Sequence, residues 1–212
     1  MSEEMANRRG FLSRLLGTAA GMTLVANGRA DAQPPAPVAS GADAWIREVK
    51  GTHRCLFDFP QHKNGAPLLH ILNYLNTYNE AYKSAPGTVG AVGTFYSIGT
   101  QSSIALGFND AMWSKYKLGE SQKVNDGGTP ATKNPHASVA NDLAKRGVIV
   151  AVCGMATMRI ARAVAGDAGM SAADVEADLR ANLVTPTARV VAAGVIVTNR
   201  AQERGFSYTY VG

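Results

Sequence analysis

The feature that most constrains the fold is a repeated alternation of short β-prone runs with longer segments of helical periodicity. The runs are rich in β-branched and aromatic residues, whereas the segments between them carry apolar residues three and four positions apart. Strands separated by helices pair in parallel, because each helix returns the chain to the same end of the sheet. The sequence therefore predicts an α/β domain in which helices cover both faces of a mainly parallel, five-stranded sheet. The expected strands span residues 52–59, 88–96, 147–153, 187–192 and 206–211.

The third of these runs ends on a cysteine. Gly147 is followed by Val-Ile-Val-Ala-Val, which is typical of a strand buried on both faces, and Cys153 comes next, where a helical pattern begins. Ligands of α/β sheets gather at the carboxyl ends of the strands. A helix N-terminus also stabilises the negative charge of a thiolate, the nucleophilic form of cysteine. Cys153 is thus a candidate nucleophile, with a buried structural cysteine as the alternative.

Local signals mark the ends of the expected helices. Pro67 suits the first turn of a helix, Ser138 and Ser171 are candidate N-caps, and Gly205 suits the position after a C-terminus. Residues 117–136 show no period and are rich in Gly, Asn, Pro and Thr, which predicts a lid, an interface arm or a disordered insertion. The expected helices span 67–82, 104–116, 138–146, 157–165, 171–183 and 194–204.

The N-terminus resembles a twin-arginine export signal. Arg8 and Arg9 lie in Asn-Arg-Arg-Gly-Phe-Leu, an apolar segment follows, and Ala-Asp-Ala at 30–32 matches a signal peptidase site. We therefore expect export to the periplasm of a bacterium. The apolar segment is shorter than the ~20 residues needed to span a bilayer, so we expect no membrane association after cleavage. The predicted divisions are a signal peptide at 1–32, a linker and N-terminal extension at 33–50, and one folded domain at 51–212.

Export makes a disulfide between the two cysteines the default expectation. Cys55 lies near the start of one expected strand, whereas Cys153 ends another. In a parallel sheet this offset amounts to roughly 13 Å, at ~3.3 Å per residue. A disulfide requires Cα atoms within ~7 Å, so the sequence predicts two free thiols.

Several classes of function lack support in the sequence. The formal net charge of +5 is modest and is spread without basic runs, so we expect no nucleic-acid partner. The spacing of His53, His70 and His136 matches no metal-ligand pattern. The Gly-x-x-Gly at Gly90 to Gly93 falls inside an expected strand, whereas a phosphate-binding loop follows a strand. We therefore predict neither a bound metal nor a cofactor.

The C-terminal half of the chain resembles the DsrE/DsrF-like family. The resemblance lies in Arg-Gly-Val-Ile-Val-Ala-Val-Cys-Gly-Met-Ala at 146–156, preceded by Asn134 and Pro135. It continues in Ala-Gly-Val at 193–195, which opens a helix, and in Gln-Glu-Arg-Gly-Phe-Ser-Tyr at 202–208. The similarity is good over 134–211 and loose over 52–116.

The resemblance implies a three-layer α/β/α sandwich that assembles into homotrimers or hexamers. It also makes Cys153 the counterpart of the cysteine that carries persulfide sulfur in sulfurtransferases of the family. Protein partners that donate or accept sulfur are then expected.

Turns at the expected carboxyl edge supply further candidate site residues. His62 follows the first strand and is a candidate base or charge partner for the thiolate. Lys63 and Asn64 share that turn and are candidates to bind an anion such as sulfite or thiosulfate. Thr100 and Gln101 follow the second strand and are candidates to line the same crevice. For each, an exposed or capping role is the alternative.

Two functions remain open from the sequence. The first is a periplasmic sulfur-handling protein that binds or transfers sulfane sulfur on Cys153, either as a sulfurtransferase or as a carrier. The second is a non-enzymatic, oligomeric module of the same fold that binds a small ligand or cofactor.

Overall fold

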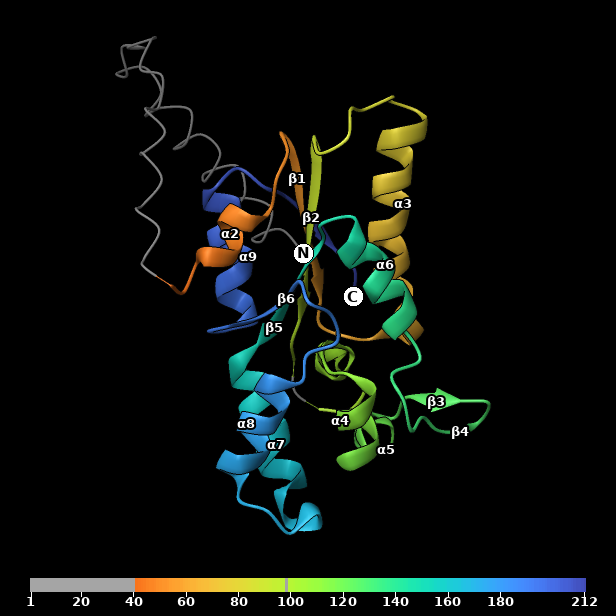
Figure 1. The fold of residues 1–212 in the computed structure, drawn as a ribbon, viewed down its shortest axis with the longest axis vertical. Helices are drawn as coiled ribbons and strands as arrows, with labels where there is room; N and C mark the ends of the chain where they lie inside the picture. The colour runs from red at the N-terminus through yellow and green to blue at the C-terminus, as the bar shows by residue number, and fades with distance from the viewer. Residues whose placement is uncertain (1–40, 98) are drawn as a thin grey trace, which may run out of the picture. The chain divides into compact units, whose positions relative to one another are not determined.

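The computed structural model describes residues 41–97 and 99–212, which are built on one parallel sheet (Figure 1). Its strands lie in the order β6-β5-β2-β1-β7, and every neighbouring pair is parallel. The five-stranded parallel sheet predicted from the sequence is therefore confirmed. The predicted signal peptide and residues 33–40 of the predicted linker and N-terminal extension lie outside the described residues. The strands are β1 (His53–Phe59), β2 (Val89–Phe95), β5 (Ile149–Cys153), β6 (Ala188–Val191) and β7 (Ser207–Tyr210).

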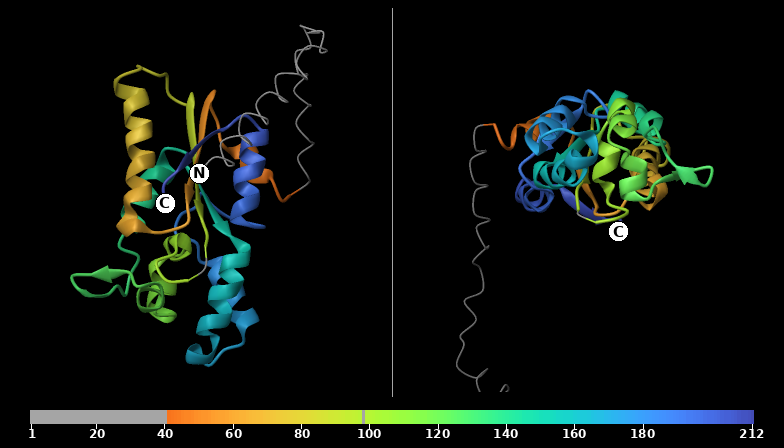
Figure 2. Two further views of the ribbon diagram at one scale, coloured as in Figure 1. Left: turned by 180° about the vertical axis from the view of Figure 1, so that it is seen from behind. Right: turned by 90° about the horizontal axis from the view of Figure 1, so that it is seen from below.

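Helices cover both faces of the sheet and complete a three-layer α/β/α sandwich (Figures 1 and 2). One face carries α3 (Ala66–Glu80) and α6 (Ala137–Lys145), and the other carries α2 (Ala44–Glu48) and α9 (Gly194–Glu203). Successive side chains of a strand point to opposite faces, so β1, β2, β5 and β6 contribute to both cores. Phe57 of β1 is buried in the cluster on the α3 side, and its neighbour Leu56 is buried in the cluster on the α9 side.

Helix α2 lies within the predicted linker and N-terminal extension, where the sequence shows no helical period. Its Trp45 and Ile46 are buried, and the Trp45 ring meets Phe206 edge-on, with ring centroids 6.4 Å apart. The packed domain therefore includes residues that precede position 51.

The strand register separates the two cysteines. Cys55 is paired with Ala91 of β2, whereas Val92, one residue further on, is paired with Ile149 of β5. Cys55 is consequently level with the residue before β5 begins, and Cys153 is at the far end of that strand. Both are free thiols, as predicted.

Further helices lie beyond the carboxyl edge of the sheet. Helices α7 and α8 form a pair that extends away from the end of β5. Helices α4 and α5 lie beside this pair (Figure 1). Ser171 is the N-cap of α8 as predicted, since its side chain accepts the N–H of Asp174 at 3.1 Å. The bounds are α4 (Asp110–Lys115), α5 (Leu118–Gln122), α7 (Gly154–Ala168) and α8 (Ala172–Ala181).

The prediction of a single helix at 104–116 is wrong. The chain forms the 3₁₀ helix η3 (Ser103–Gly107) and then α4, with an extended break between them. Asn109 causes the restart, because its side chain accepts the N–H of Met112 at 3.2 Å and caps α4. Gly107 holds η3 close to the sheet, since a Cβ there would lie 2.8 Å from the side chain of Val152.

The segment at 117–136 contains regular structure that the sequence does not predict. Helix α5 is followed by a short hairpin, β3 (Asn125–Asp126) and β4 (Thr129–Pro130). The next helix, α6, has His136 rather than Ser138 at its N-cap, without a capping side-chain hydrogen bond. Among the described residues, no helix has the length and apolar character needed to cross a membrane.

Candidate functional site

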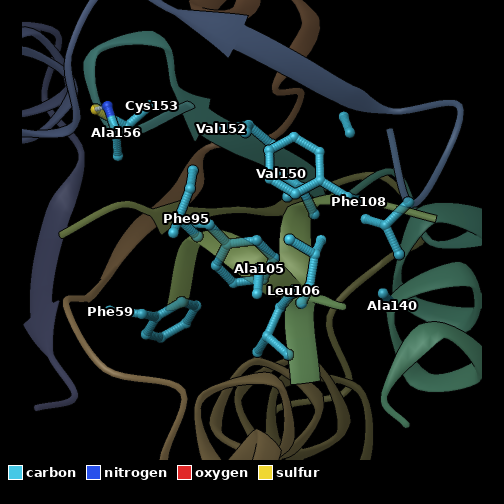
Figure 3. Close-up of a cluster of buried hydrophobic side chains, with 14 of the residues drawn as sticks. Phe59, Phe95, Ala105, Leu106, Phe108, Ala140, Val150, Val152, Cys153 and Ala156 are labelled. Carbon is cyan, nitrogen blue, oxygen red and sulfur yellow. Dashed lines mark hydrogen bonds between the residues drawn. The ribbon is translucent and has the colours of Figure 1, made fainter. Parts of the chain in front are cut away.

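Cys153 lies at the junction between the buried strand β5 and helix α7. It is the N-cap of α7, with extended backbone angles, and its Sγ accepts the N–H of Ala156 at 3.4 Å. The carbonyl of Cys153 accepts the hydroxyl of Thr157 at 2.9 Å, which fixes the first turn. Figure 3 shows Cys153 and Ala156 beside buried side chains that include Val152. The sulfur is thus held at the positive end of the helix dipole.

A glycine allows the helix to begin directly after the cysteine. A Cβ on Gly154 would lie 2.9 Å from the carbonyl oxygen of Val191 in the neighbouring strand β6. The close approach of these backbones places the first turn of α7 against the edge of the sheet. It also keeps Cys153 only 5% exposed.

Cys153 borders an open pocket of about 390 Å³. Three elements meet there: the end of β2 with Tyr96, the first turns of α7, and the start of α9 with Gly194. A Cβ on Gly194 would lie 2.5 Å from Cγ of Tyr96, so the ring rests directly on the glycine. Strand order explains this meeting, because β5 is flanked by β2 and β6. The pocket is lined by Tyr96, Ser97, Cys153, Met155, Ala156, Arg159, Ala193, Gly194 and Val195.

A second pocket of about 270 Å³ adjoins the first along α7. The two pockets share Ser97, Ala156 and Arg159. The wall of this second pocket carries polar side chains, including that of the predicted site residue Thr100. Among the described residues, Arg159 is the only charged one that lines either pocket.

Exposed apolar side chains surround the entrance of the cysteine pocket. Met155 is 48% exposed, and Val195 and Ile196 are 61% and 47% exposed. The first two line the pocket itself, and all three lie in the first turns of α7 and α9. The thiol is therefore reached through a largely apolar opening.

A buried carboxylate lies next to Tyr96. Asp58 of β1 accepts hydrogen bonds from Thr94 Oγ1 at 3.1 Å and from the Tyr208 hydroxyl at 2.7 Å. Burial, reinforced by Asp58, raises the pKa of Tyr208 to about 12. The same causes raise the pKa of Tyr96 well above its ordinary value of 10.0. Tyr96 therefore keeps its proton at neutral pH.

His62 contacts a different set of residues from the cysteine. It is 4% exposed, its Nδ1 accepts the N–H of Asn64 at 3.1 Å, and its backbone N–H donates to the carbonyl of Gln101 at 2.9 Å. It lines neither pocket, and among the described residues no hydrogen bond joins it to Cys153. The ends of β1 and β5 are separated by β2, or roughly 10 Å at ~4.8 Å per strand.

Burial makes His62 and its neighbour His136 resist protonation. It lowers the pKa of His62, against a smaller opposing effect of the Gln122 backbone. Yet Nε2 of His62 is buried with no partner in hydrogen-bonding geometry among the described residues, so the opposing contact is weak. Burial also lowers the pKa of His136, and His62 lowers it further. The described contacts thus favour a neutral, structural His62.

Of the remaining predicted site residues, one lines a pocket and the others lie in turns outside both pockets. Lys63 and Asn64 are exposed in a turn with positive φ angles of 41° and 48°, and neither lines the two pockets. Gln101 also has a positive φ, of 68°, and its backbone N–H donates to the carbonyl of Gln122 at 2.9 Å. Of this group, only Thr100 lines a pocket.

Sequence reasoning missed Tyr96 and Arg159. Helical spacing gives a signal for the second, since Arg159 lies three positions after Ala156, and residues three apart on a helix are neighbours on its surface. Tyr96 shows no local signal, because its place beside Cys153 depends on the pairing of β2 with β5. Within the described ranges, no group of three or more His, Cys, Asp or Glu residues is arranged to hold a metal.

A solved structure is similar to this chain, whereas the sequence comparisons give no match. No protein-family model matches the chain, and no curated protein matches it in sequence. A solved structure of a protein of unknown function from Methanobacterium thermoautotrophicum is similar to it, with 17% sequence identity and a TM-score of 0.43. The similar region covers 76% of this chain and 100% of the other.

Proposed function

We propose that this chain is a DsrE/DsrF-like sulfur-handling protein that binds or transfers sulfane sulfur as a persulfide on Cys153. The observation that carries the proposal is the placement of the thiol. Its sulfur accepts an amide N–H at the start of α7 and borders an open pocket at the carboxyl edge of the sheet. A persulfide is more extended than a thiol and is anionic, so it benefits from both the space and the helix N-terminus.

Mass spectrometry of the protein after incubation with thiosulfate or polysulfide tests the proposal. We expect one added sulfur, about 32 Da, that is located on Cys153 by peptide mapping and removed by a reductant. The adduct should be absent from Cys153→Ala and from Cys153→Ser, the second of which retains an oxygen to cap α7. The matched control is Cys55→Ala, because Cys55 is a free thiol with 2% exposure inside the sheet. An adduct that persists without Cys153, or no adduct, contradicts the proposal.

The proposal includes export and assembly. The predicted twin-arginine signal at 1–32 would deliver the folded protein to the periplasm, and a reporter fused after residue 32 tests this in strains with and without the twin-arginine translocase. A homotrimer or hexamer is the proposed assembly, and native mass spectrometry measures it. Sulfur would enter or leave through a donor or acceptor protein.

A second function is favoured by one feature, the largely apolar lining of the pocket and its extension along α7. A non-enzymatic module that binds a small ligand or cofactor would use this space without a reactive thiol. Such a ligand would be revealed by the absorbance spectrum and the native mass spectrum of protein purified from the periplasm of the bacterium that produces it. Retention of that ligand by Cys153→Ser would favour this function over sulfur transfer.

A further inference from the structure

Arg159 connects the two pockets beside Cys153. It lies six positions after the cysteine on α7, about 9 Å along the helix axis at ~1.5 Å per residue. Side chains on a helix lean toward its N-terminus, so the long arginine side chain reaches back over the preceding turn. This agrees with its presence in the lining of both the cysteine pocket and the adjoining one.

The guanidinium of Arg159 has no hydrogen bond or ion pair among the described residues. Neighbouring arginines do have contacts: Arg180 pairs with Glu176 at 2.7 Å, and Arg162 on α7 contacts the sulfur of Met158 at 3.4 Å. Arg159 is the only charged residue in the part of each lining that the structure describes, so no carboxylate there neutralises it.

The rest of the lining suits a small anion that carries sulfur. Ser97 and Thr100 add hydroxyl groups to the wall that Arg159 shares, and the first turn of α7 adds the helix dipole. Arginine recognises planar or tetrahedral oxyanions through several parallel N–H donors. The cysteine end of the space has fewer polar side chains and is largely apolar. A ligand with an oxyanion at one end and a soft sulfur at the other matches this arrangement.

We infer that Arg159 binds the anionic end of the sulfur donor, so that Cys153 takes sulfur from small anionic sulfane compounds, of which thiosulfate is the simplest. This inference rests on the proposed function and adds the substrate class to it. It replaces Lys63 and Asn64, which line neither pocket, as the source of anion recognition.

The transfer step is balanced without an oxidant or reductant. The Cys153 thiolate attacks the outer sulfur of thiosulfate, and a new S–S bond forms as the S–S bond of thiosulfate breaks. The electron pair of the broken bond leaves with sulfite, and Cys153 becomes an anionic persulfide. No proton is taken up or released when the attacking group is the thiolate. Arg159 holds the oxygens that are common to thiosulfate and the departing sulfite.

Two alkylating agents of nearly equal size test the anion site without any sulfur transfer. Iodoacetate is anionic and iodoacetamide is neutral, and both alkylate a thiolate with loss of iodide. The ratio of their rates at Cys153, measured by peptide mapping on the full chain at one pH, reports attraction of the anion. We expect Arg159→Gln to lower this ratio roughly tenfold, the size of one charge-assisted contact. Arg159→Lys should retain part of the ratio, because it keeps the charge.

The matched control is Arg162→Gln, which removes a charge from the same helix at a residue that lines neither pocket. The ratio of the iodoacetate and iodoacetamide rates at Cys153 should stay within about twofold of the wild-type value, because solvent screens a charge on the surface. An equal effect of the two variants, or no effect of Arg159→Gln, would overturn the inference, as would a Cys153 that neither reagent modifies.

Thiosulfate loading then separates the two proposals. Arg159→Gln should load sulfur from thiosulfate roughly tenfold more slowly than wild type, in line with the alkylation ratio. If Arg159→Gln lowers the alkylation ratio but wild-type protein accepts no sulfur, the anion site stands and sulfur transfer fails. If wild type loads sulfur and Arg159→Gln loads it equally fast, the assignment of Arg159 fails and sulfur transfer stands.

Discussion

Replacement of Gly194 by alanine should both destabilise the protein and restrict the cysteine pocket. The added Cβ would lie 2.5 Å, 2.7 Å and 2.9 Å from Cγ, Cβ and Cδ1 of Tyr96. These atoms lie at the base of the ring, close to the backbone of β2, so they cannot move aside by a simple rotation. Overpacking of this kind costs about 1–3 kcal/mol. For a domain of this size, that corresponds to a melting temperature lower by roughly 3–10 °C.

The assay combines thermal unfolding, followed by circular dichroism, with the rate of Cys153 alkylation by iodoacetamide. Gly194→Ala should lower the melting temperature and slow the alkylation, because the methyl group and the displaced ring both occupy the pocket. Tyr96→Ala removes the ring atoms at 2.5 Å and 2.9 Å but keeps Cβ at 2.7 Å, so Gly194→Ala should cost less in that background without becoming neutral. The coupling between the two sites then measures the contact itself.

The matched control is Gly166→Ala in the interior of α7. A Cβ at Gly166 meets no atom within 4 Å, so alanine there should stabilise the helix by about 0.5–1 kcal/mol. The reasoning is refuted if Gly194→Ala is as stable as wild type and its cysteine reacts at the same rate.

Two further predictions concern buried polar groups near the site. Because burial lowers the pKa of His62 and of His136 below the ordinary 6.5, the unfolded chain binds protons that the folded chain does not. The contribution of these neutral histidines to the free energy of unfolding should be fully present above pH 6.5. It should decrease as the pH falls from 6.5 toward the pKa values of the folded state. The variant His62→Asn keeps an acceptor near the position of Nδ1 but cannot be protonated, so its free energy of unfolding should depend less on pH. Urea unfolding at a series of pH values measures this, and a pH dependence equal to that of wild type would contradict the prediction. Asn134 is 5% exposed and its amide donates to the carbonyls of Leu106 and Phe108 at 3.1 Å and 3.0 Å. Asn134→Ala leaves both carbonyls buried without a donor and should cost about 2–4 kcal/mol, measured by the urea midpoint; a loss below about 1 kcal/mol would mean that water replaces the amide.

The sequence alone determined those features that depend on neighbouring residues. Alternating apolar runs and helical periods were sufficient to predict a parallel sheet, and the apolar run before Cys153 placed the cysteine at a strand end. Ser171 and Gly205 marked helix ends correctly, because a capping hydrogen bond and a positive φ angle are local properties. The helix predicted at 104–116 failed because Asn109 caps a new helix within an otherwise helical pattern.

Tertiary structure decided which strand ends lie together, and thereby which residues accompany Cys153. Strand order is not encoded in local periodicity, since any of the other four strands could have paired with β5. The observed order places β2 and β6 on the two sides of β5, which brings Tyr96 and the start of α9 to the thiol. It leaves β1, and with it His62, one strand further away. The sequence thus determined that Cys153 ends a buried strand at the carboxyl edge, and packing determined that Tyr96 and Arg159 line its pocket.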